Sequence, residues 1–212
     1  MSAREPTRRT VLLGAASAFA GSALLAGTRR TAGAQAIEPV SCALVLAVDV
    51  SSSIDGEHWW LQRKGYADAF LHPEVIRAIG DTARGRIAVS YFEWAGAASQ
   101  RVIVPWTVVA SEEDGGAIAD TLLNGGRPFE GSTGLGAALE ASMAQLAGCP
   151  FTADQKVIDV SGDGASNDGP QPELKREDAA RANIRVNGAG KVTLTNGIIA
   201  TEPRRFFTIR AP

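Results

Sequence analysis

The sequence has few of the side chains that most often carry catalysis or bind soft metals. Its 212 residues include two histidines, two cysteines and two methionines, and aromatic residues make up 6%. His58 and His72 lie beside no Gly-x-Ser-x-Gly pattern, which argues against a Ser–His–Asp hydrolase. No Gly-Lys-Ser/Thr sequence closes the glycine-rich stretch at residues 131–136, which argues against a nucleotide-binding phosphate loop.

The sequence also lacks a large excess of charge. Apolar residues make up 45% and charged residues 21%, which excludes collagen-like, wholly disordered and polytopic membrane proteins. The net charge of −2 is unevenly distributed, because residues 1–36 contain five arginines and one glutamate. The remaining residues are therefore net acidic, and we expect no nucleic-acid surface there.

The basic N-terminal segment has the pattern of an export signal. Arg8 and Arg9 precede a weakly apolar run that continues to Gly27, and residues 34–36 read Ala-Gln-Ala, a cleavage signature. We predict a twin-arginine signal peptide over residues 1–36 and a periplasmic or secreted protein, tethered to the membrane if the signal stays uncleaved. The alternative is an ordinary secretory signal with two adjacent arginines.

Export affects the interpretation of the two cysteines. Cys42 and Cys149 each precede a predicted strand, and in an oxidising compartment such a pair favours a disulfide. The alternative is two buried free thiols.

The mature chain alternates apolar strand patterns with amphipathic helix patterns, which predicts an α/β fold with a mostly parallel central sheet. The loop over residues 95–99 is short and rich in small residues, so it predicts a hairpin and one antiparallel strand. The expected strands are residues 43–50, 86–94, 100–108, 156–160 and 184–187, and the expected helices are residues 56–71, 73–78, 112–123, 134–146 and 172–183.

Three loops at the carboxyl ends of these strands carry oxygen-bearing side chains. Asp49, Ser51 and Ser53 follow the first strand with a spacing of two, Thr133 lies in a Gly-Ser-Thr-Gly turn, and Asp163 follows the fourth strand. Such ligands suit a divalent cation, Mg²⁺ above all, with Mn²⁺ and Ca²⁺ as alternatives. Two carboxylates balance its charge and leave a coordination position for a carboxylate from a partner. Taken alone, the first motif could instead be a helix N-cap after a buried aspartate.

This ligand set resembles the metal-ion-dependent adhesion site (MIDAS) of von Willebrand factor type A (vWA) domains. The resemblance covers roughly residues 41–187 and implies a Rossmann-like three-layer fold. The phrases at residues 92–94, 104–106 and 157–164 are similar, more narrowly, to a bacterial exported family of uncharacterised vWA-like proteins. We expect a vWA-like domain over residues 37–187. Residues 188–212 lack the family's last strand and helix, so we expect a divergent or truncated end there.

The resemblance implies a non-enzymatic module that binds a cation and recognises an acidic residue on a protein partner. Glu93 and Trp94, at the end of the second strand, are candidate partner contacts, although Trp94 could instead cover the hairpin. Two other functions stay open: a metal-dependent hydrolase, disfavoured because no general base is evident near the loops, and a structural subunit of an envelope complex.

Overall fold

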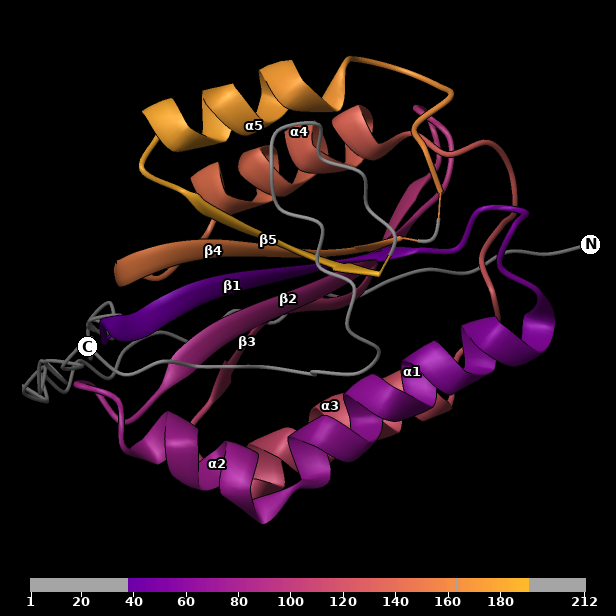
Figure 1. Ribbon diagram of the computed structural model, residues 1–212. Helices are drawn as coiled ribbons and strands as arrows, with labels where there is room; N and C mark the ends of the chain where they lie inside the picture. The colour runs from indigo at the N-terminus through magenta and orange to yellow at the C-terminus, as the bar shows by residue number, and fades with distance from the viewer. Residues whose placement is uncertain (1–37, 163, 191–212) are drawn as a thin grey trace, which may run out of the picture. The chain divides into compact units, whose positions relative to one another are not determined.

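The computed structural model describes residues 38–162 and 164–190, which form one sheet between two layers of helices (Figure 1). The strands are β1 (Val40–Asp49), β2 (Ile87–Trp94), β3 (Gln100–Val109), β4 (Ala153–Gly162) and β5 (Arg185–Gly190). The helices are α1 (Gly56–Leu71), α2 (Pro73–Gly80), α3 (Glu112–Leu123), α4 (Leu135–Ala147) and α5 (Pro172–Arg181).

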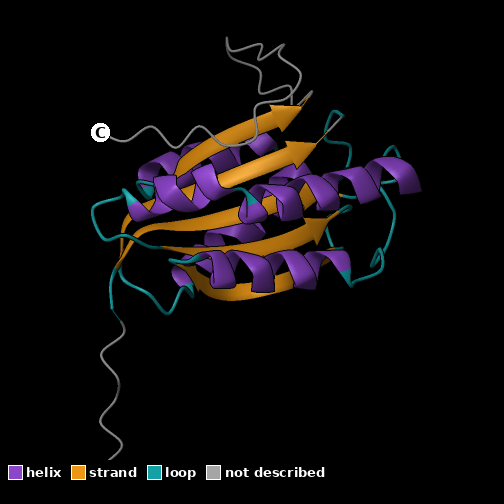
Figure 2. Cartoon of the chain, turned by 90° about the horizontal axis from the view of Figure 1, so that it is seen from below, coloured by secondary structure: helices purple, strands orange, loops and turns teal. Residues whose placement is uncertain are grey.

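The five strands lie in the order β3-β2-β1-β4-β5. Figure 2 shows strands of this sheet side by side. β1 pairs in parallel with β2 and β4, and β4 pairs in parallel with β5. β2 and β3 are antiparallel and joined by the short loop at residues 95–99, as predicted. The predicted α/β fold class, with a mostly parallel sheet and one antiparallel strand, is confirmed.

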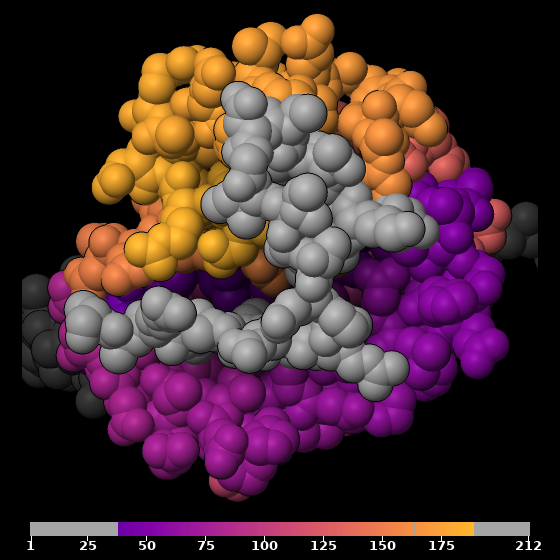
Figure 3. Space-filling model, viewed as in Figure 1, coloured from indigo at the N-terminus to yellow at the C-terminus, as the bar shows by residue number. Residues whose placement is uncertain are grey.

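The central position of β1 accounts for its nearly continuous apolar sequence. Successive side chains of a strand point to opposite faces, so both faces of β1 must be apolar when helices cover both. Leu44, Leu46 and Val48 belong to the core under α1, α2 and α3, whereas Ala43 and Val45 belong to the core under α4. In the space-filling view, α1 and α5 form outer surfaces on opposite sides of the sheet (Figure 3).

Local sequence explains where several helices begin. The Asp55 carboxylate caps α1 by accepting a hydrogen bond from the His58 amide at 2.8 Å. Pro73 occupies the first turn of α2, where its missing N–H costs nothing. Ser111 and Asp114 form a capping box at the start of α3.

The structure extends some of the predicted elements. β4 begins three residues earlier than expected and ends two residues later, and β5 reaches Gly190, inside the segment predicted to be divergent. The predicted signal peptide and residues 191–212 lie outside the described residues. Of the helices in the described part of the chain, none is long and apolar enough to cross a membrane.

The predicted disulfide is not present in the structure, where Cys42 and Cys149 are both free. Cys42 has the same parity along β1 as Leu44, so it packs against the α1-side core, whereas Cys149 packs against the α4-side core. The sheet therefore separates the two thiols, which corrects the prediction. Burial raises the pKa of the Cys42 thiol to about 11.

Candidate metal-binding site

The loop after β1 brings together the three side chains of the Asp-x-Ser-x-Ser motif. Asp49 is the last residue of β1, and its Oδ1 accepts a hydrogen bond from the Ser51 amide at 2.7 Å. That turn places Ser51 Oγ 3.1 Å from Ser53 Oγ. Asp49 and Ser51 are fully buried and Ser53 is exposed, so the oxygens run from the sheet end to the surface.

The turn that carries Thr133 lies against this loop. The Ser52 amide donates to the Gly131 carbonyl at 2.9 Å, and Thr133 is 6% exposed. Gly134 fixes the turn from the other side, because its amide donates to the Ala95 carbonyl at 2.7 Å. A Cβ on Gly134 would stand 2.8 Å from the Ala97 nitrogen, so this approach requires glycine.

The loop after β4 also reaches the Thr133 turn. The Asn167 side-chain Oδ1 accepts from the Thr133 amide at 2.8 Å, and the Asn167 amide donates to the Thr133 carbonyl at 2.9 Å. Gly162, at the end of β4, lies so close to Asp49 that a Cβ there would be 3.1 Å from Asp49 Oδ2. Asp163 itself lies outside the described residues, so its side chain remains a prediction.

Asp168 ties the same loop to the hairpin between β2 and β3. Its Oδ2 accepts from the Ala97 amide at 2.8 Å and from the Ser132 hydroxyl at 3.0 Å. The Ala97 hydrogen bond, helped by the one from Ser132, lowers the pKa of the Asp168 carboxyl below its ordinary value. Four loops, at residues 50–55, 95–99, 127–134 and 164–169, are thus joined by hydrogen bonds; we call them the loop cluster.

Arg127 is a further member of the loop cluster that sequence reasoning missed. Its Nη2 lies 2.7 Å from the Val50 carbonyl, 3.0 Å from the Ser51 carbonyl and 2.7 Å from the Ile54 carbonyl. Its Nη1 pairs with Glu130 at 2.9 Å, and its side chain is 13% exposed. An arginine in a Gly-Gly-Arg-Pro loop gives no sequence signal of this role.

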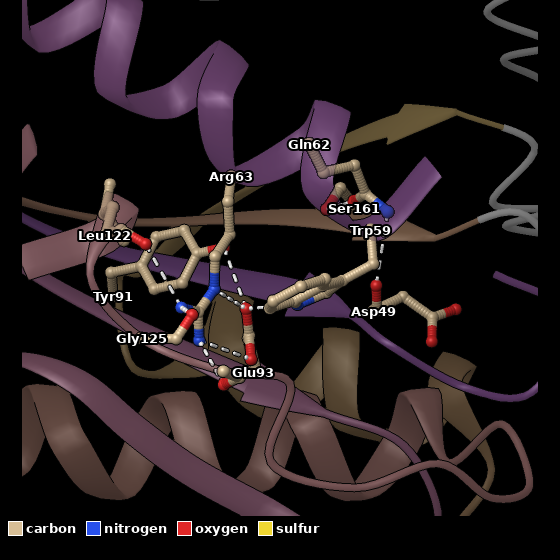
Figure 4. A network of polar contacts seen from close by, with 10 residues as sticks. Asp49, Trp59, Gln62, Arg63, Tyr91, Glu93, Leu122, Gly125 and Ser161 are labelled. Atoms are coloured by element: carbon tan, nitrogen blue, oxygen red, sulfur yellow. Dashed lines mark hydrogen bonds and ion pairs between the residues drawn. The ribbon is translucent and has the colours of Figure 1, made fainter. Parts of the chain in front are cut away.

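Glu93 and Trp94 do not present side chains to a partner, which corrects that expectation. Both are buried, with exposures of 0% and 1%. Glu93 forms an ion pair with the equally buried Arg63 at 2.6 Å and accepts from Trp59 Nε1 at 3.1 Å (Figure 4). Glu93 is buried under α1, through Arg63 and Trp59, whereas Trp94 packs into the core on the α4 side of the sheet.

Two further contacts connect α1 to the strand ends. Gln62 Nε2 donates to the Asp49 carbonyl at 3.4 Å, and Ser161 Oγ donates to Gln62 Oε1 at 3.5 Å (Figure 4). Both distances are at the long end for hydrogen bonds. Gln62 nevertheless lies between the ends of β1 and β4, the strands that lead to Asp49 and Asp163.

Comparison with known proteins places the chain in a family. The sequence model of a family described as a protein of unknown function (DUF1194) matches residues 39–207. The chain belongs to this family. A comparison with curated proteins finds no match.

Solved structures with a similar fold include vWA proteins. Proximal thread matrix protein 1 from the mussel byssus has a TM-score of 0.54 at 19% identity, over 72% of this chain and 38% of that one. The pilus adhesin SpaC of Lactobacillus rhamnosus GG has a TM-score of 0.52 at 16% identity, over 73% and 24%. A von Willebrand factor type A protein from Catenulispora acidiphila has a TM-score of 0.51 at 15% identity, over 72% and 33%.

These similarities confirm the predicted resemblance to vWA domains at the level of the fold. The chain spans well under half the length of each of these three relatives. At such identities the similarity shows a shared fold, so the chemistry of this DUF1194 member must be argued from its own residues.

The donor atoms of the loop cluster fit a hard divalent cation. Neighbouring ligands in an octahedral Mg²⁺ site with bonds of about 2.1 Å are about 3 Å apart, which is close to the separation of the Ser51 and Ser53 hydroxyls. Within residues 38–162 and 164–190, no group of three His, Cys, Asp or Glu side chains is placed to hold a metal. A cation here would therefore depend on hydroxyl oxygens beside Asp49, a donor set that disfavours soft metals.

Proposed function

We propose that this protein is a vWA-type interaction module that binds a divalent cation, Mg²⁺ by preference, and through it an acidic side chain of a protein partner. Asp49, Ser51, Ser53, Thr133 and Asp163 are the proposed ligands. The observation that carries the proposal is the convergence of the Asp-x-Ser-x-Ser loop, the Thr133 turn and the loop after β4 at one edge of the sheet. A structure of the mussel protein has a zinc occupied MIDAS motif, which supports the use of this fold for cation binding.

The electrostatics of the edge explain why the partner group would be a carboxylate bound through the cation. α4 begins two residues after Thr133, and the positive end of its dipole favours negative charge there. The exposed start of α1, however, carries Asp55 and Glu57, which would repel an acidic group in the absence of a cation. Capture of an acidic partner should therefore depend on the metal.

Cation titration of the purified full-length protein tests the site. We expect wild-type protein to bind Mg²⁺ or Mn²⁺ in calorimetric titrations, and Asp49→Ala to weaken binding at least about 100-fold, since it removes a direct ligand. Asp154→Ala is the matched control, because Asp154 pairs with Arg84 at the opposite edge of the sheet. Equal affinity in wild type and Asp49→Ala would refute the site.

A capture experiment tests the partner. Immobilised protein is incubated with envelope extract in Mg²⁺ or in chelator, beside Asp49→Ala under the same conditions. We expect proteins that are retained only by wild type with Mg²⁺, and loss of retention when an acidic residue of the retained protein is replaced by its amide. Retention that is indifferent to chelator would count against recognition through the cation.

A further inference from the structure

Arg127 joins two of the loops that carry the proposed ligands. It lies in the segment that leads to Thr133, yet its guanidinium reaches three carbonyl groups of the loop that carries Ser51 and Ser53. The Ser52–Gly131 backbone hydrogen bond is a second connection between the same two loops. The relative position of these loops therefore depends on a side chain that is not itself a ligand.

The contacts of Arg127 are directed at the loop backbone. The Val50, Ser51 and Ile54 carbonyls all lie at one nitrogen, Nη2, so the carbonyls before and after Ser53 are held around the same atom. The ion pair of Nη1 with Glu130, at 2.9 Å, adds one further contact to the guanidinium. Because the side chain is largely buried, water competes little for these carbonyls.

Stability alone accounts poorly for this residue. Arg127 Nε is buried and has no hydrogen-bond partner among the described residues. A buried donor without a partner costs stability, so an arginine is not the least costly way to fill this space. Its guanidinium also places a positive charge beside a proposed cation site, where charge alone would oppose binding.

We propose that Arg127 is a positioning residue that holds the Asp-x-Ser-x-Ser loop in its cation-binding form before the cation arrives. This inference rests on the proposed function, since it concerns the same cation. Preorganisation lowers the entropic cost of ordering the loop on binding. Loss of the guanidinium should therefore weaken cation binding, although it removes a repulsive charge. If Arg127 positions the loop, its replacement by a neutral residue should lower cation affinity. If its main effect is charge repulsion, the same replacement should raise cation affinity.

The test compares Mn²⁺ affinity in wild type, Arg127→Met, Arg127→Lys and Asp49→Ala by calorimetric titration of the full chain, at a temperature where circular dichroism shows each to be folded. Arg127→Met should bind roughly 10- to 100-fold more weakly, and Arg127→Lys, which keeps the charge but not the fork, roughly tenfold more weakly. Arg84→Met is the matched control, since Arg84 pairs with Asp154 far from the loop cluster, and its affinity should equal that of wild type.

The outcomes separate this inference from the proposed function. If Asp49→Ala loses binding but Arg127→Met binds as tightly as wild type, or more tightly, positioning by Arg127 is wrong while the site stands. If Asp49→Ala binds like wild type, the proposed site is wrong. If Arg127→Met does not fold, hydrogen exchange of residues 50–54 in cation-free Arg127→Lys decides: faster exchange with weaker Mn²⁺ binding supports positioning, and unchanged exchange overturns it.

Discussion

Two arginines, Arg63 and the partly exposed Arg127, donate to backbone carbonyls, and they do so in different surroundings. Arg63 donates to the Leu122, Gly125 and Gly126 carbonyls and forms an ion pair with Glu93, with both side chains fully buried. Arg127 holds three carbonyls of the loop cluster and pairs with Glu130, which is 63% exposed.

The two arginines differ in their main partners: a buried carboxylate for Arg63 and backbone carbonyls for Arg127. Around Arg63 the carboxylate and the guanidinium neutralise each other, Trp59 Nε1 and Tyr91 Oη also donate to Glu93, and the Trp59 ring lies 4.8 Å from the guanidinium carbon. In the loop cluster Asp49 Oδ1 accepts instead from a backbone amide, and Arg127 is directed at carbonyl groups. The Arg63 region is suited to holding the fold, and the loop cluster to holding a ligand. The predictions below test that division.

The largest effect is expected at Arg63. Arg63→Met leaves the Glu93 carboxylate buried without its counter-charge, so the free energy of unfolding should fall by about 3–5 kcal/mol. Urea unfolding measures this loss. Mn²⁺ affinity of the folded fraction should match that of wild type; a loss as large as in Arg127→Met would break the division between the two regions.

A close backbone contact beside the loop cluster should give the next largest effect. A Cβ on Gly136, in the first turn of α4, would lie 1.9 Å from the Pro170 carbonyl oxygen, so Gly136→Ala must push two backbone segments apart. We expect a loss of about 1–3 kcal/mol in urea unfolding. Gly116→Ala is the matched control, because nothing lies within 4 Å of a Cβ there, and alanine in helix α3 should stabilise by about 0.5–1 kcal/mol. Equal changes in unfolding free energy for Gly136→Ala and Gly116→Ala would contradict the close contact between Gly136 and Pro170.

Asp159, on the α1 side of β4, should give a smaller effect that depends on pH. Burial raises the pKa of Asp159 from 3.8 to about 6. Between these values the folded protein holds a proton that the unfolded chain has lost, so stability falls as the pH rises through this window. At pH 7 Asp159→Asn should be more stable than wild type by about 1–2 kcal/mol, and near pH 4 the two should converge. Urea unfolding of both proteins at several pH values measures this. A difference in unfolding free energy that does not change with pH would show that Asp159 is not the cause.

The smallest effect is expected at Asp168. Hydrogen bonds lower the pKa of its carboxyl, so its contribution is present above the ordinary aspartate pKa and is lost as the pH falls through the lowered value. Asp168→Asn should lower the melting temperature at pH 7 and not at pH 2–3. Asp81→Asn, which removes a highly exposed carboxylate with a 3.9 Å ion pair, is the control and should change little at either pH. A larger loss in the control would show that Asp168 does not join the loops.

Local patterns were sufficient for most of the fold. The apolar run of β1, the small residues at 95–99 and the stripe on α1 each depend on neighbours in sequence, and each predicted its element. The burial of Glu93 was missed because it depends on α1, and that of Trp94 because it depends on α4; both helices are distant in sequence from β2. The separation of the cysteines was accessible in part, since Cys42 and Leu44 have the same parity in β1 and therefore share a face.

The sequence predicted several side chains that the structure brings close together, and it did not predict the contact of Arg127 that joins their loops. Asp49, Ser51 and Ser53 form a local spacing, and a turn is enough to bring the serine hydroxyls together. Arg127 and Asp168 act across long stretches of chain, through contacts with backbone groups that any residue type could supply. Contacts of this kind therefore cannot be predicted from a pattern of side chains in the sequence.

The central place of β1 in the sheet has a kinetic consequence. Its pairing with β4 joins Val48 to Ser161 across most of the described chain, and such distant pairings form slowly because a long loop must close first. The loop after β4 cannot meet Asp49 until that closure, so a bound ion would contribute nothing to the early steps of folding. It would instead slow unfolding, since it binds the finished sheet and must leave before the strands separate.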